Sequence, residues 1–161
     1  MIETVIGQLQ SVKAILNVNL RGVGHEASLR SPEPAGNCLN WIVGHLVAAY
    51  DNLLGVLGGA PVLTAEQKAL YERGSGPFTD PQQAMPLDDL QGAFAAAHER
   101  VIEALQGFPT ERLAEPAPFS PTNNPDETMG SLIAVFAFHQ AYHTGQTGLG
   151  RRLVGLDGAV A

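Results

Sequence analysis

The stretch FHQAYHTGQ, residues 138–146, places two histidines four positions apart inside an apolar segment. On an α-helix, residues four apart lie one above the other, with Cβ atoms about 5–6 Å apart. His139 and His143 would therefore share one helix face, from which both imidazoles can reach a single metal ion. Neutral ring nitrogens bind zinc, nickel, copper and iron well. The alternative is a pair of ordinary polar side chains on a solvated face.

The residues around the pair predict a helix over about 127–154. Its apolar stripe advances by alternating steps of four and three residues, through Leu132, Phe136, His139, His143, Gln146, Gly150 and Leu153. This stripe predicts that both histidines are buried. A buried polar group without a partner costs roughly 1–3 kcal/mol, and a shared cation would give both rings one partner. Burial therefore favours a metal site over a solvated face.

The run GQTGLG, residues 145–150, is superficially similar to a phosphate-binding loop. Its glycine order does not fit a dinucleotide-binding loop, and no strand precedes it. A glycine inside a helix costs about 1 kcal/mol relative to alanine. We therefore expect Gly145, Gly148 and Gly150 to permit close helix packing.

Three further segments carry helical periodicity, at about 2–20, 38–58 and 87–106. We expect Asn37 to cap the second, Gly58 and Gly59 to end it, and Gly107 with Pro109 to end the third. With the segment at 127–154, they make four amphipathic helices, each roughly 30 Å long. Four helices of matched length predict an all-α protein, a four-helix bundle with little or no sheet.

The predicted connections, 21–37, 59–86 and 107–126, are long and hold most of the prolines. Loops of this length in a compact domain need a structural or functional reason. The segment TAEQKALYERG predicts a short extra helix capped by Thr64, with Glu66 near its start. Long connections also permit a crossover, so an up-down-up-down order is not required.

A third inward-facing histidine strengthens the metal hypothesis. His45 lies in NWIVGHLVAAY, between Ile42 and Leu46 on the apolar side of the second helix. Alone it would be read as a hydrogen-bonded core histidine, but with the other pair it completes a three-nitrogen site. His98, at the edge of an apolar stripe, is interpreted as structural, and His25 as a solvated loop residue.

The pattern around these histidines excludes two familiar metal sites. Zinc proteases of the H-E-x-x-H class need a glutamate directly after the first histidine, and Gln140 occupies that position. A di-iron carboxylate bundle would need Glu-x-x-His pairs on two helices, and the chain has none.

The composition narrows the function classes further. The chain has 161 residues, expected to form a single domain over 1–161, and is 45% apolar. A net charge of -7 with no basic cluster argues against nucleic acid and anionic membranes as partners. The single cysteine, Cys38, precludes an intrachain disulfide, which fits a cytoplasmic protein. No signal peptide and no apolar run of membrane-spanning length is apparent in the sequence.

Over nearly its whole length the chain resembles the DinB/YfiT-like superfamily of metal-dependent enzymes. NWIVGHL, FHQAYHTGQ and GRRLVG carry the resemblance, above all the His-x-x-x-His-x-Gly-Gln pattern with an upstream inward histidine. It implies an up-down-down-up bundle, a zinc or nickel ion on His45, His139 and His143, and a homodimer. Better understood relatives are transferases that use bacillithiol, mycothiol or glutathione, and a mycothiol-dependent maleylpyruvate isomerase.

These observations lead to a metal-dependent enzyme acting on a small molecule. The metal would activate either a low-molecular-weight thiol, as the resemblance implies for an S-transferase, or water, as in a hydrolase. Trp41, Tyr142 and Gln146 are expected to line the pocket. Two alternatives stay open: a non-catalytic bundle that binds a metal, and a hydrogen-bonded histidine cluster without one.

Overall fold

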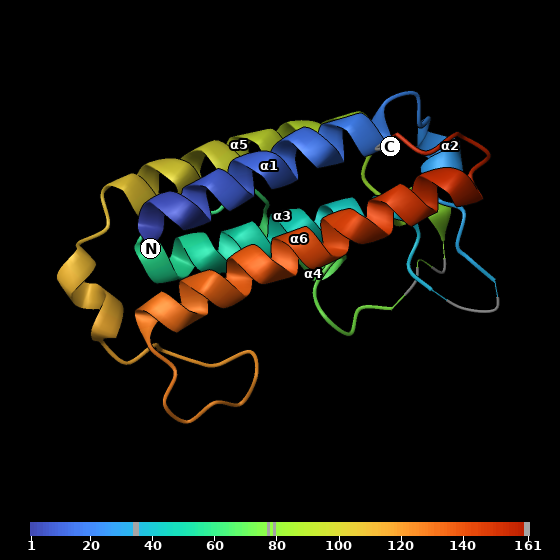
Figure 1. Cartoon of the computed structure of the whole chain (residues 1–161). Helices are drawn as coiled ribbons and strands as arrows, with labels where there is room; N and C mark the ends of the chain where they lie inside the picture. Colours follow the sequence, from blue (N-terminus) through green and yellow to red (C-terminus); the bar gives the residue numbers. More distant parts are fainter. Residues whose placement is uncertain (34–35, 77, 79, 160–161) are drawn as a thin grey trace.

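Four long helices form the protein in a computed structural model that describes residues 1–33, 36–76, 78 and 80–159 (Figure 1). They are α1 (Ile2–Leu20), α3 (Leu39–Leu57), α5 (Leu87–Gln106) and α6 (Met129–Leu153). Shorter elements are α2 (His25–Ser28), α4 (Ala65–Ala69), and the 3-10 turns η1 (Pro81–Gln83) and η2 (Thr110–Ala114). The described residues contain one isolated bridge, Pro116 with Thr128, and no strand. The predicted all-α bundle with a short extra helix is confirmed.

The helices run in the order up-down-down-up, as the resemblance implies (Figure 1). Helices α1 and α6 are parallel, because Asn19 at the end of α1 donates a hydrogen bond to Thr147 near the end of α6, at 3.0 Å. Helices α3 and α6 are antiparallel, because Gly150 near the end of α6 lies against Leu39 at the start of α3. Helix α3 packs on both α5 and α6.

The up-down-down-up order explains the long connection between α3 and α5. These two helices are parallel, so residues 58–86 must return along the whole bundle before α5 begins (Figure 1). We call residues 58–86 the crossover. Its described residues cover α3, which packs on α5 and α6 on its other sides. Fifteen of the 19 residues of α3 are therefore buried, as expected for a helix surrounded by other elements.

Buried polar groups of α3 fix the crossover in place. The carboxylate of Asp51 accepts hydrogen bonds from the backbone N–H groups of Val62 (2.8 Å) and Leu63 (3.0 Å). Further along, the fully buried Tyr71 donates its hydroxyl to Asn40 Oδ1 at 3.2 Å. Satisfied buried hydrogen bonds specify one arrangement, since an unmade one is costly. The crossover is thus held at two points along α3.

The ring of Tyr71 also needs a glycine in α3. A Cβ at Gly44 would lie 2.2–2.4 Å from three ring atoms of Tyr71, closer than real Cβ contacts allow. Gly44 therefore lets an aromatic ring lie directly on the helix backbone. The next residue along α3 is His45, so this contact brings the crossover backbone beside a histidine of the candidate site.

Most predicted helix ends are confirmed within two residues. Gly58 ends α3 in a left-handed conformation, with φ 82°, and Thr64 caps α4 in a capping box with Gln67. The prediction that Asn37 caps α3 is wrong. The N-cap is Cys38, which makes no side-chain capping bond.

The predicted buried stripe of α6 is wrong in its second half. Gln146 is exposed, and Leu153 is 55% exposed. Alternating steps of four and three average 3.5 residues per turn, whereas an α-helix has 3.6, so the stripe drifts by about 20° every seven residues. The buried face instead continues through Gln140, Thr144 and Thr147. His139 and His143 consequently lie at the edge of the core, half-buried.

Of the three glycines in the run at 145–150, Gly150 permits close packing and Gly148 lies against Asn19. A Cβ at Gly150 would meet the Leu39 side chain at 2.6 Å, and one at Gly148 would lie 3.4 Å from Asn19. At Gly145 nothing lies within 4 Å, so that part of the expectation is wrong. No helix in the described part of the chain is long and apolar enough to cross a membrane.

The remaining two histidines lie outside the candidate site. His98 is buried in the core, where its Nδ1 shares a hydrogen bond with the Tyr50 hydroxyl at 3.2 Å. Burial lowers the pKa of His98 to about 4, so this ring is neutral at pH 7. His25 begins the short helix α2, although a loop was expected, and is exposed.

We predict that Gly44→Ala destabilises the protein by about 2–3 kcal/mol, because the added methyl overpacks against Tyr71. Gly55→Ala on the same helix is the matched control, since nothing lies within 4 Å of its Cβ position. It should leave stability unchanged or raise it by up to ~1 kcal/mol. Urea unfolding followed by circular dichroism measures both. Equal stability of the two variants would contradict the packing of Tyr71 on Gly44.

Candidate metal centre

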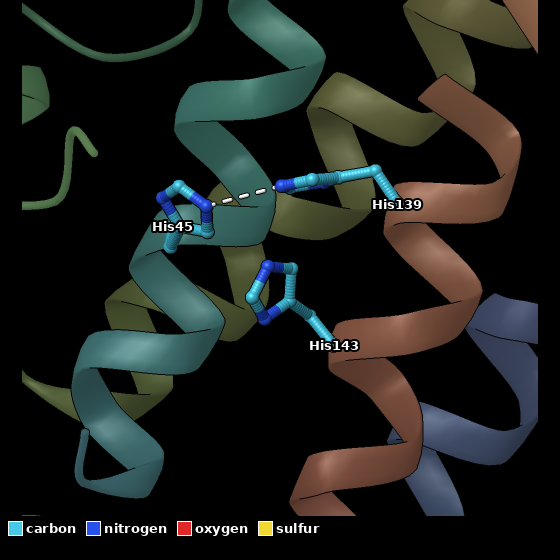
Figure 2. Close-up of side chains that lie close together, drawn as sticks. All are labelled: His45, His139 and His143. Carbon is cyan, nitrogen blue, oxygen red and sulfur yellow. Dashed lines mark hydrogen bonds between the residues drawn. The ribbon is translucent and has the colours of Figure 1, made fainter. Parts of the chain in front are cut away.

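Three histidines from two antiparallel helices converge on one point (Figure 2). His45 comes from α3, and His139 and His143 come from successive turns of α6. One ring nitrogen from each lies within 4.8 Å of the others. The Nε2 atoms of His45 and His139 are 3.1 Å apart. The structure thus brings together all three histidines that the sequence singles out.

The backbone of the crossover fixes the proton of His45. Its Nδ1 lies 2.7 Å from the carbonyl oxygen of Tyr71. A carbonyl oxygen only accepts, so Nδ1 carries the proton and donates it. The Nε2 lone pair is consequently left for the centre of the group. This outer hydrogen bond is the kind that orients a histidine ligand and selects its tautomer.

A neighbouring side chain does the same for His143. Its Nδ1 donates to the Gln146 amide oxygen at 2.7 Å, one turn further along α6. The other ring nitrogen points toward the space between His45 and His139 (Figure 2). Two of the three rings therefore have their protons on the outer nitrogen and their lone pairs turned inward.

His139 has a different environment. Because Nε2 of His45 carries no proton, the 3.1 Å contact between the two Nε2 atoms is a hydrogen bond donated by His139. The buried Nδ1 of His139 has no hydrogen-bond partner among the described residues. This ring can therefore exchange its contact with His45 for a cation without breaking a bond to the rest of the protein.

Burial keeps the group neutral. It lowers the pKa of His139 to about 4, with His143 and His45 adding to the effect. Burial also lowers the pKa of His45, although the Tyr71 carbonyl opposes the shift, and that of His143, opposed by Gln146. Only a neutral imidazole has a lone pair to give to a metal. At neutral pH, all three rings are therefore neutral, and a cation would displace only the Nε2 proton of His139 toward its free Nδ1.

These residues fit a divalent metal ion. Two nitrogens bound at 2.0–2.1 Å to one tetrahedral ion are about 3.3 Å apart, close to the observed 3.1 Å between His45 and His139. Three nitrogen donors leave a position for substrate, as in catalytic zinc sites. The donor set also suits nickel, copper and iron.

A cavity of about 620 Å³, which we call the outer chamber, opens onto all three rings. Trp41 and Tyr142 line it, whereas Gln146 does not and instead contacts His143. The Trp41 ring stacks on His45, with centroids 4.7 Å apart and planes at 14°. Tyr142 presents its ring edge-on to His143, at 5.1 Å between centroids.

A second cavity of about 320 Å³, which we call the inner chamber, adjoins the outer chamber, and His45 and His139 line both. Its walls come from α3, the crossover, the segment before α6 and α6. They are mostly apolar and include Ala48, Ala49, Phe119, Pro121, Val135 and Phe136, while the crossover adds the charged residues Glu72 and Arg73. His45 and His139 are therefore accessible from both a larger chamber and a smaller, mostly apolar one, and His143 from the larger one.

The sequence patterns do not indicate the crossover residues of the site. Tyr71 orients His45 through a backbone carbonyl, which any residue type could supply. Ser75 accepts a hydrogen bond from Trp41 Nε1 at 2.9 Å, and Arg73 lines both chambers. The only signal in the sequence is the length of the crossover itself.

Comparison with known proteins agrees with the fold described above. A crystal structure of a conserved protein of a locus from Enterococcus faecalis superimposes with a TM-score of 0.75. The two chains are 16% identical, and the match covers 94% of this chain and 95% of that one, so it shows the same fold. The search of curated proteins gives no match. The sequence model of the DinB superfamily matches residues 8–147. The chain therefore belongs to the DinB superfamily.

Proposed function

We propose that this protein is a metal-dependent S-transferase that uses a low-molecular-weight thiol. His45, His139 and His143 would hold the ion, zinc or nickel. The observation that carries the proposal is the convergence of their three inner nitrogens, two of them with the proton fixed on the outer nitrogen. Membership of the DinB superfamily supports the metal.

The ion supplies one chemical effect when bound: it lowers the pKa of a thiol, so that the thiolate forms near neutral pH. The protein supplies the rest. The stacked Trp41 and the Tyr71 carbonyl hold the ring of His45 in one orientation. The outer chamber gives a thiol and its electrophile access to the histidines from one side.

The thiol must come from outside the chain. Cys38 is the only cysteine, it is 4% exposed, and it is not among the residues that line either chamber. Burial raises the pKa of its thiol, which makes it a poor nucleophile. A small thiol that enters the outer chamber is therefore the nucleophile that we propose.

Thiol transfer is favoured over hydrolysis because the described residues place few carboxylates beside the histidines. Activation of water usually needs a carboxylate or histidine within hydrogen-bond reach. No Asp or Glu is among the residues that line the outer chamber. The carboxylate that lines the inner chamber, Glu72, is paired with Lys68 at 3.6 Å. A thiol, whose ordinary pKa is about 8.5, ionises at a metal more readily than water and depends less on such a base.

We predict that zinc- or nickel-loaded protein accelerates the reaction of a small thiol with an electrophile. The assay follows adduct formation between monochlorobimane and each of a panel of thiols by fluorescence. His143→Ala should lose at least about 100-fold in rate because it removes one of three ligands. His25→Ala, a change at an exposed histidine outside the site, should keep full activity.

Two outcomes would contradict the proposed activity. One is a metal-loaded protein that leaves every thiol reacting at its uncatalysed rate. The other is a His143→Ala variant as active as the wild type. Metal-dependent cleavage of nitrophenyl esters without any thiol would favour the hydrolase alternative instead.

We further predict that Gln146→Ala weakens zinc binding by about 10-fold, because His143 loses the acceptor for its Nδ1 proton. Gln146→Glu keeps an acceptor there and should bind zinc at least as tightly as the wild type. Gln106→Ala, at an exposed glutamine ending α5, is the control and should change nothing. Competition with a chromogenic chelator measures the affinities. Equal affinity of all four proteins would show that Gln146 does not support the site.

A further inference from the structure

We propose that Arg73 binds the carboxylate of a substrate whose apolar portion occupies the inner chamber. This inference names a substrate class for the proposed function and rests on it, since it takes the three histidines as the reactive end of the cavity. It comes from three features: how Arg73 is held, which charges surround it, and how the two chambers meet.

The crossover fixes the backbone on both sides of Arg73, which is an exposed residue. Two residues before it, the Tyr71 carbonyl accepts the hydrogen bond from His45 at 2.7 Å. Two residues after it, the Ser75 hydroxyl accepts one from Trp41 at 2.9 Å and donates another to the Leu70 carbonyl at 3.0 Å. Arg73 therefore lies midway between two points at which the crossover is hydrogen-bonded to α3. The α3 side chains at these points, His45 and Trp41, both belong to the candidate site.

The turn after Arg73 is also tightly specified. Gly74 and Gly76 have positive φ angles of 91° and 74°, which side chains other than glycine rarely adopt. The Ser75 N–H donates to the Glu72 carbonyl at 3.0 Å. These bonds fix the backbone on each side of Arg73, so its position beside the chambers follows from the crossover fold.

The charges around Arg73 favour an anionic ligand. The chain carries a net charge of -7, yet Arg73 is the only charged residue among the described lining of the outer chamber. No described carboxylate lies within 4.0 Å of its guanidinium. The ion pairs that the described residues form all join other side chains. A guanidinium presents a planar fork of donors that matches a carboxylate.

The meeting of the two chambers suggests how such a substrate lies. His45, His139 and Arg73 line both chambers. An anionic group at Arg73 therefore leaves the rest of the molecule free to extend past the histidines into the inner chamber. The side chains there are mostly apolar and include Phe119 and Phe136. Its volume of about 320 Å³ is enough for a phenyl ring or a short hydrocarbon chain.

The test compares two probes that differ only in charge, 3-phenylpropanoate and 3-phenylpropanamide. Trp41 is the only tryptophan of the chain and lies in the outer chamber, so its fluorescence reports binding. Metal-free protein is used, with its helix content checked by circular dichroism. We expect the carboxylate to bind at least about 10-fold more tightly than the amide, as a charge-assisted hydrogen bond allows.

Three variants make the result specific. Arg73→Gln should bring the affinity ratio of the two probes to about one. Arg30→Gln removes an exposed arginine outside the chambers and should leave the ratio unchanged. Arg73→Lys keeps the charge without the fork and should give an intermediate ratio.

The inference is overturned if neither probe binds, if wild type binds both equally, or if Arg73→Gln keeps the preference for the carboxylate. Because no metal is present, the result does not depend on the three-histidine site holding an ion. If the protein fails to bind a metal but still shows an Arg73-dependent preference for the carboxylate, that result contradicts the proposed transferase activity and leaves the role of Arg73 intact.

Discussion

The hydrogen bond from His45 to the Tyr71 carbonyl joins the fold to the candidate chemistry. Tyr71 reaches this point because α3 and α5 are parallel, so the crossover must run back along α3. Its ring lies on the helix because residue 44 is a glycine. The bond then fixes the proton of His45 on Nδ1 and leaves Nε2 as a lone-pair donor toward α6.

The site balances burial against access. Burial keeps the three imidazoles neutral by lowering their pKa values, yet the rings lie at the edge of the core and line open chambers. Full burial would exclude a substrate, and full exposure would leave histidine pKa values near 6.5. The drift of the buried face along α6 creates this intermediate position. Gln140, and not its histidine neighbours, is the residue packed into the interior, where its amide nitrogen donates to the Leu46 carbonyl.

Much of the fold follows from the sequence, and so do the central residues of the site. Helical periodicity and the stops at glycine located the four long helices, because these signals are local. The three histidines could be grouped because inward-facing positions of packed helices must meet. The place of Tyr71, Ser75 and Arg73 could not be predicted. It depends on a backbone carbonyl, a turn and the path of the crossover, and none of these leaves a periodic pattern.

The measurement that tests this account most directly is the metal content of tag-free protein after incubation with zinc and desalting, determined by inductively coupled plasma mass spectrometry. The account predicts one zinc ion per chain for the wild type and for His98→Gln, whose substituted histidine is buried elsewhere in the core. It predicts near-complete loss for His45→Ala and for His139→Ala. A wild type that retains no metal, or alanine variants that retain as much as the wild type, would contradict the three-histidine centre.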